Sequence, residues 1–507
     1  MEEKLAVALS HSVLPFSQHG PLRERRFPAV ANGQKRGGDV WIAPEGDMTQ
    51  CFWDFSRLHS SRLAVPASGR TPKEISCNPR EGSAILLYMD DNRPNRMRGM
   101  EEKLAAALSQ KPVVLLQGPR EAGKTTLARL AVEVRPTRYV TLDDAVVLDA
   151  ARNDPAGFVA HTGGPVILDE VQRAPELFAA IKAEVDRQRQ PGRFLLTSSA
   201  NILLMPKVSE LQAAGQMETL TLRPFSQGEI AGEPELFIDR VFAETPLPAS
   251  GEAHDLTVCM LAGGYPPAVE LTDIDRRAWF SEYVKTILER DVREMAHIDA
   301  LALRRLLVQI AARAGSLVNF AELARSVVMP KTTVKRYFEL LESAFLVQCL
   351  PAWSSTDPGR RLIMAPKLFL GDTGMAAYLL GLNEERLEQD AQLRGALLEN
   401  FVAAELLKQS GWSRRDVHVF HLRTAGGQQV GFVLEEVGGK IVGIEVKASA
   451  AIARRDFTGL RALAEMAGTK FHRGIILYAG RDSTGRSAVS SDPHLCALPV
   501  SALWESV

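Results

Sequence analysis

The sequence predicts an α/β fold with a parallel sheet in the central part of this 507-residue chain. Short apolar runs alternate with segments of helical periodicity from residue 100 onward, which indicates βαβ units. The runs are apolar at every position, as is typical of strands buried on both faces of a sheet. Because the chain is too long for a single core, we expect about three domains.

The expected elements follow one another in a regular order along the chain. Helices are expected at 101–110, from Lys124 to about Val134, and at 175–189. The predicted strands are Val113–Leu116, Tyr139–Leu142, Pro165–Leu168 and Phe194–Thr197. Beyond the sheet, the pattern predicts a Pro-rich linker at 233–250, a mostly helical part at 254–313, a helix-turn-helix-like unit at 315–350 and further α/β structure at 362–507.

Residues 1–99 differ from the rest of the chain. They are rich in Pro, Gly, Arg and Ser and show weak hydrophobic periodicity. Residues 1–10 nearly repeat residues 100–109, and only Val7 differs from its counterpart Ala106. A local duplication or a start codon placed too far upstream would both give this repeat. We expect residues 11–99 to be poorly ordered and the first compact domain to begin near Met100.

Composition and charge exclude several classes of protein. The net charge of −1 gives no global positive field for non-specific nucleic-acid binding. The five cysteines are far apart and form no CxxC pair, which predicts neither a zinc ribbon nor a disulfide framework. The sequence has no apolar run of 18 residues and no secretory signal at its first residues. A cytoplasmic protein without membrane contact is therefore expected.

The strongest motif lies between the first expected strand and the helix after it. It has the form GxxxxGK[ST], in which glycines let backbone N–H groups surround phosphates, the lysine adds a charge and the hydroxyl ligates Mg²⁺. The alternative, a chance glycine loop, is disfavoured by the correct strand and helix on either side. The expected ATP-binding residues are Gly118, Pro119, Arg120, Glu121, Ala122, Gly123, Lys124, Thr125 and Thr126.

A second motif completes the candidate site. The apolar segment 166–168 ends in Asp169 and Glu170. Together with Thr125, Asp169 is expected to hold Mg²⁺, whereas Glu170 would orient and deprotonate the attacking water. Lys124 and Glu170 are thus the candidate catalytic residues. The alternative is a solvated strand end, which the spacing of about 45 residues from Lys124 makes a weaker explanation.

Polar residues after the next strand are candidates for sensing the γ-phosphate. They are Thr197, Ser199 and Asn201, and the alternative is that they only cap the following turn. Several arginines are also candidates. Arg120 lies within the glycine loop, and Arg223 lies in the segment LRPFS (222–226). Arg290 and Arg293 would suit an arginine finger, although a salt-bridged helix surface explains these two more simply.

With these residues in place, the chain resembles bacterial and archaeal AAA-superfamily ATPases that carry a C-terminal, nuclease-like domain of unknown function. The resemblance covers about residues 100 to 480, and the ordered combination of segments is more specific than the glycine loop alone. The matching segments are GPREAGKTTL (118–127), VILDEVQ (166–172), LLTSSANILL (195–204), LRPFSQGEI (222–230), LERDVREMAHI (288–298), TTVKRYFELLESAFLV (332–347), LFLGDTGMAAYLLGL (368–382), GALLENFVAAEL (395–406) and IEVKAS (444–449).

The resemblance implies three domains after the extension at 1–99. A P-loop NTPase domain of the AAA type would occupy 100–245, a helical region with a winged-helix-like module 246–352, and a fold similar to PD-(D/E)xK nucleases 353–507. In the winged-helix-like module, 320–324 would form the first helix. Lys331, Lys335 and Arg336 would lie on the recognition helix, suited either to DNA phosphates or to a purely structural or protein-binding role.

The nuclease-like domain departs from the family pattern at one position. Nuclease sites of this type need carboxylates for Mg²⁺ and a lysine near the attacking hydroxide. Glu445 and Lys447 share one face of an apolar strand, and Glu399 is a further candidate ligand. Gly431 stands where the family carries an aspartate, and Glu435 would have to reach back. Glu445 and Lys447 therefore form either a remnant of a metal site or a buried ion pair.

Three functions remain as hypotheses. The first is Mg²⁺-dependent ATP hydrolysis that drives a conformational change in the C-terminal domains. The second is a nucleotide-dependent switch that binds DNA or protein and hydrolyses little. The third, which Gly431 disfavours, is a metal-dependent DNA endonuclease. ATP and Mg²⁺ are the expected ligands. DNA and a second copy of the chain, in a homo-oligomer, are candidate partners.

Overall fold

The chain divides into two compact units, Met1–Asn95 and Arg96–Val507. In the computed structural model, the first unit contributes one antiparallel hairpin, β1 (Glu74–Asn78) and β2 (Ser83–Leu87). The expected poor order of 11–99 falls mostly on residues outside the described part and stays a prediction. The described residues are 74–78, 83–87, 96, 98–131, 137–202, 206–245, 247, 255–291, 299–354, 364–424, 426–480 and 492–505.

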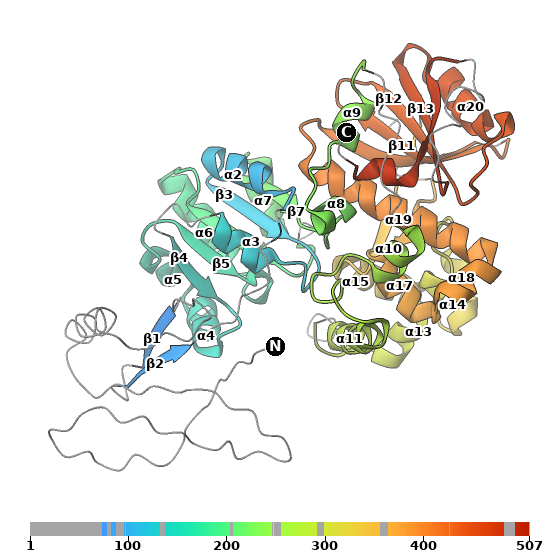
Figure 1. Cartoon of the computed structure of the whole chain (residues 1–507). Helices are drawn as coiled ribbons and strands as arrows, with labels where there is room; N and C mark the ends of the chain where they lie inside the picture. Colours follow the sequence, from blue (N-terminus) through green and yellow to red (C-terminus); the bar gives the residue numbers. More distant parts are fainter. Residues whose placement is uncertain are drawn as a thin grey trace, which may run out of the picture. The chain divides into compact units, whose positions relative to one another are not determined.

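The second unit contains the parallel sheet that the sequence predicts, with five strands instead of the four expected (Figure 1). The strand order is β4-β5-β6-β3-β7, which places the glycine loop after β3 between the ends of β6 and β7. The fifth strand, β7, was not expected from the sequence. The strands are β3 (Val113–Gln117), β4 (Arg138–Thr141), β5 (Val166–Asp169), β6 (Phe194–Ser198) and β7 (Met217–Thr221).

Helices cover both faces of this sheet because its strand residues alternate between two cores. Val113 and Leu115 of β3 pack in the core with α4 to α7, whereas Val114 and Leu116 pack in the core with α2 and α3. The helices are α2 (Glu101–Gln110), α3 (Lys124–Leu130), α4 (Ala145–Asn153), α5 (Pro155–His161), α6 (Leu177–Arg187) and α7 (Pro206–Ala213), with a short 3₁₀ turn η1 (Val171–Arg173) after β5.

Four helices follow β7 and lead away from the sheet. The linker expected at 233–250 is wrong in part, because 237–241 form a helix whose Phe237, Ile238 and Val241 are buried in a larger core. The prolines around it gave a misleading linker signal. The helices are α8 (Gln227–Ala231), α9 (Phe237–Val241), α10 (Leu256–Ala262) and α11 (Asp273–Thr286), which continues into the π-helical turn η2 (Ile287–Asp291).

The helix-turn-helix-like part has three helices and two antiparallel strands. Asn319 caps the second helix through its side chain, and Val328 ends it in the left-handed conformation. An isolated bridge joins Leu317 to Lys367 in the second strand. The elements are α13 (Ala300–Ala311), α14 (Phe320–Val327), α15 (Lys331–Ser343), β8 (Val347–Leu350) and β9 (Lys367–Leu370).

The C-terminal part has a mixed sheet of order β10-β11-β12-β13-β14, antiparallel as far as β12 and parallel beyond it. Residues of α19 and α20 join separate cores that contain strand residues of this sheet. The elements are α17 (Thr373–Leu380), α18 (Glu384–Gln389), α19 (Ala391–Trp412), β10 (Val417–Arg423), β11 (Gln429–Glu436), β12 (Ile441–Lys447), η3 (Arg454–Phe457), α20 (Thr458–Ala467), η4 (Gly468–Lys470), β13 (Phe471–Tyr478), β14 (Leu495–Pro499) and η6 (Val500–Leu503).

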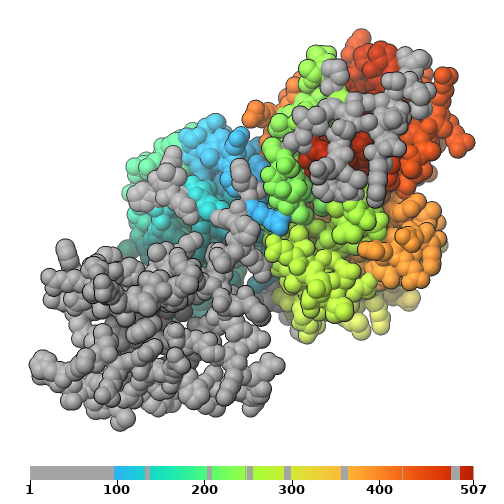
Figure 2. Space-filling view, viewed as in Figure 1, coloured from blue at the N-terminus to red at the C-terminus, as the bar shows by residue number. Residues whose placement is uncertain are grey.

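The segment after β7 connects the first sheet to the C-terminal helices. Phe225 N–H donates to the Gly264 carbonyl over 2.7 Å, and Lys408 of α19 donates to the Phe225 carbonyl over 2.8 Å. Figure 2 shows the green residues of this part between the blue residues at the start of the second unit and the orange residues nearer the C-terminus. No described helix combines the length and the apolar character that crossing a membrane requires.

The close approach at Gly264 gives a stability prediction. A methyl group there would lie 2.1 Å from the Phe225 carbonyl oxygen, so Gly264→Ala is expected to destabilise the protein by about 2 kcal/mol. Gly395 in α19 has no neighbour within 4 Å of an added Cβ, so Gly395→Ala is the matched control and should stabilise by about 0.5–1 kcal/mol. Calorimetric melting of the full chain checks both; equal Tm changes would contradict the packing argument.

Candidate functional site

The glycine loop between β3 and α3 has a backbone that needs glycine at both ends of the motif. Gly118 has φ +153°, and a Cβ on it would lie 1.9 Å from the Leu222 carbonyl oxygen. Gly123 has φ +90°, in the left-handed region, and Glu121 lies there too at +62°. The loop is therefore wound tightly against the segment that follows β7, with α3 beginning directly after it.

Lys124 is buried within this loop. Its Nζ donates to the Pro119 carbonyl over 2.9 Å and to Ser199 Oγ over 2.9 Å. Ser199 in turn donates to Glu170 Oε1 over 2.8 Å. Burial lowers the pKa of Lys124, while the nearby carboxylates of Glu170 and Asp169 oppose that shift. A continuous line of hydrogen bonds thus joins the lysine to Glu170.

Asp169, at the end of β5, accepts three hydroxyl hydrogen bonds. Thr125 donates to Oδ1 over 2.9 Å and Thr197 donates to the same oxygen over 2.5 Å. Tyr139 donates to Oδ2 over 2.7 Å. Burial, and to a lesser degree this hydrogen bond, raises the pKa of Tyr139. The carboxylate is thereby fixed beside the hydroxyl of Thr125, on the first turn of α3.

Glu170 is held in a left-handed conformation, with φ +59° and ψ 45°. A non-glycine residue in this region is uncommon and points to a local constraint. Its N–H donates to Thr197 Oγ1 over 3.0 Å, and Gln172 donates to its second carboxylate oxygen. The Thr197 hydroxyl therefore holds both acidic residues: it donates to the Asp169 carboxylate and accepts from the Glu170 N–H.

The structure brings together most, but not all, of the residues expected at this site. Ser199 and Thr197 join it, whereas the Asn201 N–H donates to the Ser343 carbonyl of α15 over 2.8 Å. Thr126 is exposed on the outer side of α3. Arg120 Nε lies 4.0 Å from Glu121 Oε1, and the Arg120 carbonyl accepts a hydrogen bond from the Tyr283 hydroxyl over 3.4 Å.

The described residues do not identify an arginine finger among the remaining candidate arginines. Burial lowers the pKa of Arg223 to about 10, so that the guanidinium remains charged at neutral pH. Arg293 and the side chain of Arg290 lie outside the described part of the structure. Sequence reasoning also missed two residues at the site, Tyr139 and Arg98. Neither stands in a motif, and only tertiary packing brings them to the loop.

A cluster of buried polar residues lies on the C-terminal side of the loop. We call Glu235, Asp372, Glu405 and Lys408 the buried polar link; each is at most 8% exposed. Lys408 donates to Glu405 Oε1 over 2.7 Å, and the Gln227 N–H donates to Glu405 Oε2 over 3.0 Å.

The two other carboxyl groups of the link hold backbone turns. Gly228 N–H donates to Glu235 over 2.9 Å, and Gly264 N–H donates to Asp372 over 2.7 Å. Burial raises the pKa of both carboxyl groups, and Glu405 raises that of Glu235 further. The link thus joins the segment after β7 to the helices α17 and α19.

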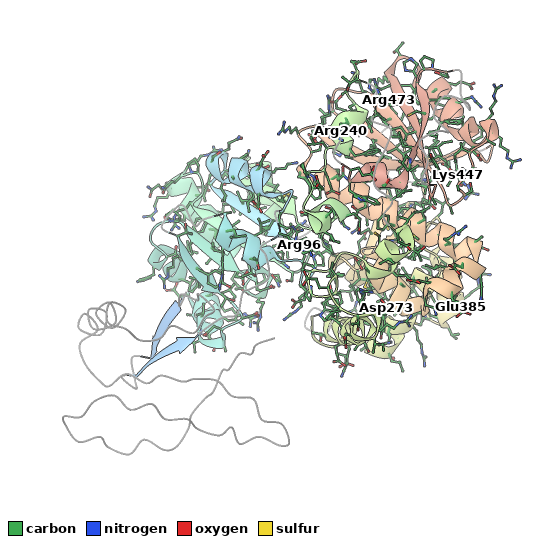
Figure 3. The ribbon with its side chains drawn as sticks, in the orientation of Figure 1. Arg96, Arg240, Asp273, Glu385, Lys447 and Arg473 are labelled. Carbon is green, nitrogen blue, oxygen red and sulfur yellow. The ribbon has the colours of Figure 1, made fainter. Side chains whose placement is uncertain are left out.

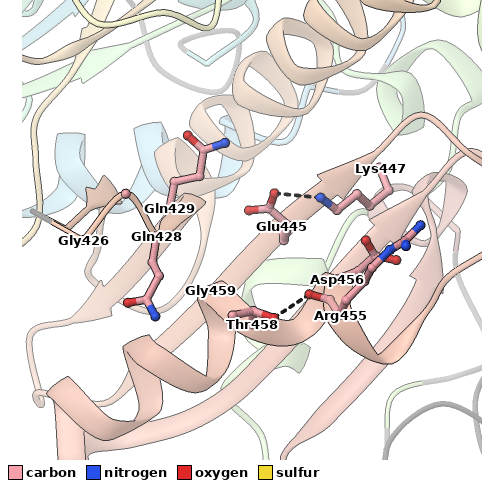
Figure 4. Close-up of a pocket in the computed structure, with 10 residues that line it drawn as sticks. Gly426, Gln428, Gln429, Glu445, Lys447, Arg455, Asp456, Thr458 and Gly459 are labelled. Carbon is pink, nitrogen blue, oxygen red and sulfur yellow. Dashed lines mark hydrogen bonds and ion pairs between the residues drawn. The ribbon is translucent and has the colours of Figure 1, made fainter.

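In the C-terminal sheet, Glu445 and Lys447 form an ion pair, one of the two alternatives that the sequence leaves open, and the pair is partly exposed. Lys447 Nζ lies 3.3 Å from Glu445 Oε1, beside an open pocket of about 330 Å³ (Figure 4). The Gly431 N–H donates to Glu445 Oε2 over 3.0 Å. Glu399 pairs with Lys367, and its Oε1 lies 3.3 Å from the position of a Cβ on Gly431. Burial raises the pKa of Glu445. Among the described residues, no group of three or more His, Cys, Asp or Glu is arranged to hold a metal ion.

Three sequence families match successive parts of the chain. Residues 110–231 match the AAA domain, 253–386 match a domain of unknown function, DUF8612, and 394–502 match another, DUF4143. The glycine loop, the acidic strand end and the parallel sheet all fall within the first match. This part of the chain is an AAA-type P-loop ATPase domain.

Relatives extend the similarity beyond that domain. Uncharacterized proteins of Mycobacterium bovis and of Mycobacterium tuberculosis are each 34% identical over 342 residues, which cover 67% of this chain and 70% of the relative. The chain belongs to the family that these two proteins represent.

Solved structures give more distant similarities. A Walker-type ATPase of Pyrococcus abyssi is 15% identical with a TM-score of 0.36, and the match covers 57% of this chain and 99% of that chain. The Holliday junction branch migration motor RuvB of Thermotoga maritima is 21% identical with a TM-score of 0.26, and the match covers 50% and 89%.

The buried polar link gives a pH-dependent prediction. Because the folded state raises the pKa of Glu235, its proton is retained above the ordinary value of about 4.3. Stability is then fully present below that value and falls as pH rises towards the folded-state pKa. The glutamine of Glu235→Gln has no proton to lose, so the Tm of this variant relative to that of wild type should rise between about pH 5 and pH 8.

Thermal melting of both proteins across this pH range, at constant ionic strength, measures the difference. Glu233→Gln removes an exposed carboxyl two residues away and is the control that should follow wild type. Parallel curves for Glu235→Gln and wild type would show that Glu235 titrates normally.

Proposed function

We propose that this protein hydrolyses ATP with Mg²⁺ and that the nucleotide state of the loop is transmitted to its C-terminal domains. The single observation that carries the proposal is the arrangement of Lys124, Ser199, Glu170, Thr125 and Asp169 around one loop. The AAA-domain match of residues 110–231 supports the same reaction class.

The donor set at the loop fits Mg²⁺. The Thr125 hydroxyl and the Asp169 carboxylate are hydrogen-bonded to each other, and hard oxygen ligands of this kind suit a cation that keeps several waters. Bound Mg²⁺ would supply charge neutralisation at the β- and γ-phosphates. Tyr139 and Thr197 keep the Asp169 carboxylate in place from its other sides.

The other residues divide the work of hydrolysis. Backbone N–H groups of the loop and the N-terminal end of α3 bind phosphate oxygens. Lys124 lies within the loop, and its Nζ would exchange the Ser199 oxygen for a phosphate oxygen. Glu170 accepts a proton from the attacking water. Its carboxylate is held at the site by Ser199, which donates to Oε1 over 2.8 Å. Ser199 links the lysine to the base and is placed to respond to a γ-phosphate.

The route to the C-terminal domains starts at the segment after β7. Its Leu222 carbonyl touches the loop at Gly118, and its Phe225 carbonyl accepts from Lys408 of α19. A shift of the loop on nucleotide binding is therefore passed to α19 through groups that are buried and hydrogen-bonded. This continuous contact supports a mechanical coupling between the loop and α19. A layer of solvent between them would not transmit such a shift.

A nucleotide-dependent switch that binds DNA is the second candidate, favoured by one observation. The order α13, the bridge at Leu317, α14, α15, β8 and β9 is compatible with a winged-helix-like module, and Lys331, Lys335 and Arg336 are exposed on α15. Cations on such a helix suit phosphate contacts. We do not propose DNA cleavage, because Gly431 and the pairing of Glu399 with Lys367 leave an incomplete donor set.

Phosphate release from Mg-ATP by the full chain tests the first proposal. Lys124→Ala is expected to abolish nucleotide binding, and Glu170→Gln to lower kcat by about 10²- to 10⁴-fold while leaving binding intact. Lys182→Ala, which removes an exposed ion pair on α6, should have no effect. Adding duplex DNA shows whether the α15 surface matters.

Each result separates the two candidates. Turnover that is lost in both variants supports hydrolysis, and stimulation by DNA supports contact through α15. Binding through Lys124 with no phosphate released under any condition would mean that the switch is the correct function.

The coupling route is tested with the paired variant Glu405→Gln/Lys408→Met, which removes both charges of the Glu405–Lys408 ion pair at once, so that neither is left buried without the other. Hydrogen exchange of α19 is expected to change when wild type binds ATP and to stay constant in the variant, although the variant still binds nucleotide. Arg414→Met, in an exposed ion pair with Glu102, is the control. An unchanged response in the double variant would refute transmission through the link.

A further inference from the structure

Arg98 is a buried arginine outside every motif that the sequence displays. It precedes α2 by three residues and lies before the residues that match the AAA domain. Its side chain is only 6% exposed, which is rare for arginine unless its donors are satisfied. Figure 3 labels its neighbour Arg96, which is more exposed and pairs with Glu270 over 3.0 Å.

The guanidinium of Arg98 has three partners from three parts of the chain. Nε donates to Glu229 Oε1 over 2.9 Å, Nη1 donates to the Ala122 carbonyl over 2.9 Å, and Nη2 donates to the Arg223 carbonyl over 2.6 Å. Its carbon lies 4.6 Å from the centroid of the Phe225 ring. The five fixed donors of a guanidinium allow such a set of bonds; the single ammonium of a lysine does not.

The bond to Ala122 determines the direction of a peptide plane in the glycine loop. The structure has no cis peptide bonds among its described residues, so the Ala122–Gly123 unit is planar and trans. In a trans unit, the C=O and the following N–H point in opposite directions. When Arg98 holds the Ala122 carbonyl on one side, the Gly123 N–H faces the other side of the loop.

The backbone of Glu121 and Gly123 is left-handed, a conformation in which successive N–H groups turn into a common concavity for anions. The glycine loop could lose this concavity by rotating the 122–123 peptide, which glycine at 123 permits. Arg98 opposes that rotation, because the rotated carbonyl would leave a buried cation with one partner fewer.

Arg98 is itself fixed by its neighbours. The Gly99 N–H donates to Glu229 Oε1 over 2.8 Å, and a Cβ on Gly99 would lie 2.6 Å from the Trp412 ring at the end of α19. Glu229 also accepts from the Ser226 N–H over 3.0 Å as part of the capping box of α8. The guanidinium is thus held by a rigid surround and can impose its geometry on the loop.

We propose that Arg98 is a positioning residue for nucleotide binding: it orients the Ala122–Gly123 peptide so that the Gly123 N–H is presented to a phosphate. The inference rests on the proposed function, since it assigns a role within the same site. Arg98 touches no nucleotide in this role and acts only through the loop. It also ties the loop to the residues that precede α2 and to the end of α19.

The experiment compares Arg98→Lys, Arg98→Ala and the control Arg96→Ala in the full chain. Isothermal titration measures the Kd for Mg-ADP and for Mg-ATP, and melting with and without saturating Mg-ADP measures the stabilisation that nucleotide gives. We expect both Arg98 variants to bind nucleotide about tenfold more weakly or worse, with a smaller Tm shift, since a bond to a charged group is lost. Arg96→Ala should bind as wild type does.

A purely structural arginine would behave differently. If the role of Arg98 is only structural, its replacement lowers the Tm in the absence of nucleotide, but the Kd and the nucleotide-induced Tm shift stay as in wild type. That result in Arg98→Lys overturns the inference. If Arg98→Ala does not fold, Arg98→Lys decides, because lysine keeps the charge and loses the fork geometry. Wild type that binds nucleotide without turnover overturns hydrolysis alone, and wild type that binds none overturns both proposals.

Discussion

The contact between the Leu222 carbonyl and the glycine loop is the constraint on which much of this molecule depends. β7 pairs with β3, so the chain that leaves β7 must run past the loop that leaves β3. At Gly118 there is no room for a side chain between them. The segment after β7, with the capping box at Ser226 and the bond from Lys408 of α19 to the Phe225 carbonyl, is therefore positioned by its contact with the glycine loop.

The same closeness explains the burial of charges there. Arg98, Glu229, Glu405 and Lys408 are all nearly inaccessible to water, and each has an oppositely charged partner at 2.7–2.9 Å. Buried pairs of this kind contribute little net stability compared with apolar packing, but they are costly to break and so favour one geometry. In this chain they favour the geometry that joins the sheet to the helices beyond it.

The fold was predictable where local patterns decide it. The strand from Val113 and the helix from Lys124 follow from an apolar run and a glycine loop. Strand alternation predicts that Glu445 and Lys447 share one face of a strand, where they form an ion pair. Tyr139 and Arg98 could not be placed, because nothing in their neighbourhood of the sequence specifies a partner 30 or 131 residues away. β7 was missed because only Met217 and Leu220 of its residues are buried, so it forms no apolar run.

The helix α19 sets the distance between the segment after β7 and the C-terminal strands. It has 22 residues, so it extends for about 33 Å, and most of its central residues are buried. Glu405 and Lys408 lie on it two turns beyond Glu399, which faces the C-terminal strands through Gly431. A helix enclosed in this way cannot fray or bend cheaply in its middle. Displacements at one end therefore reach the other as a tilt or a slide of a stiff rod, and a small angular change near the segment after β7 is enlarged with distance along it.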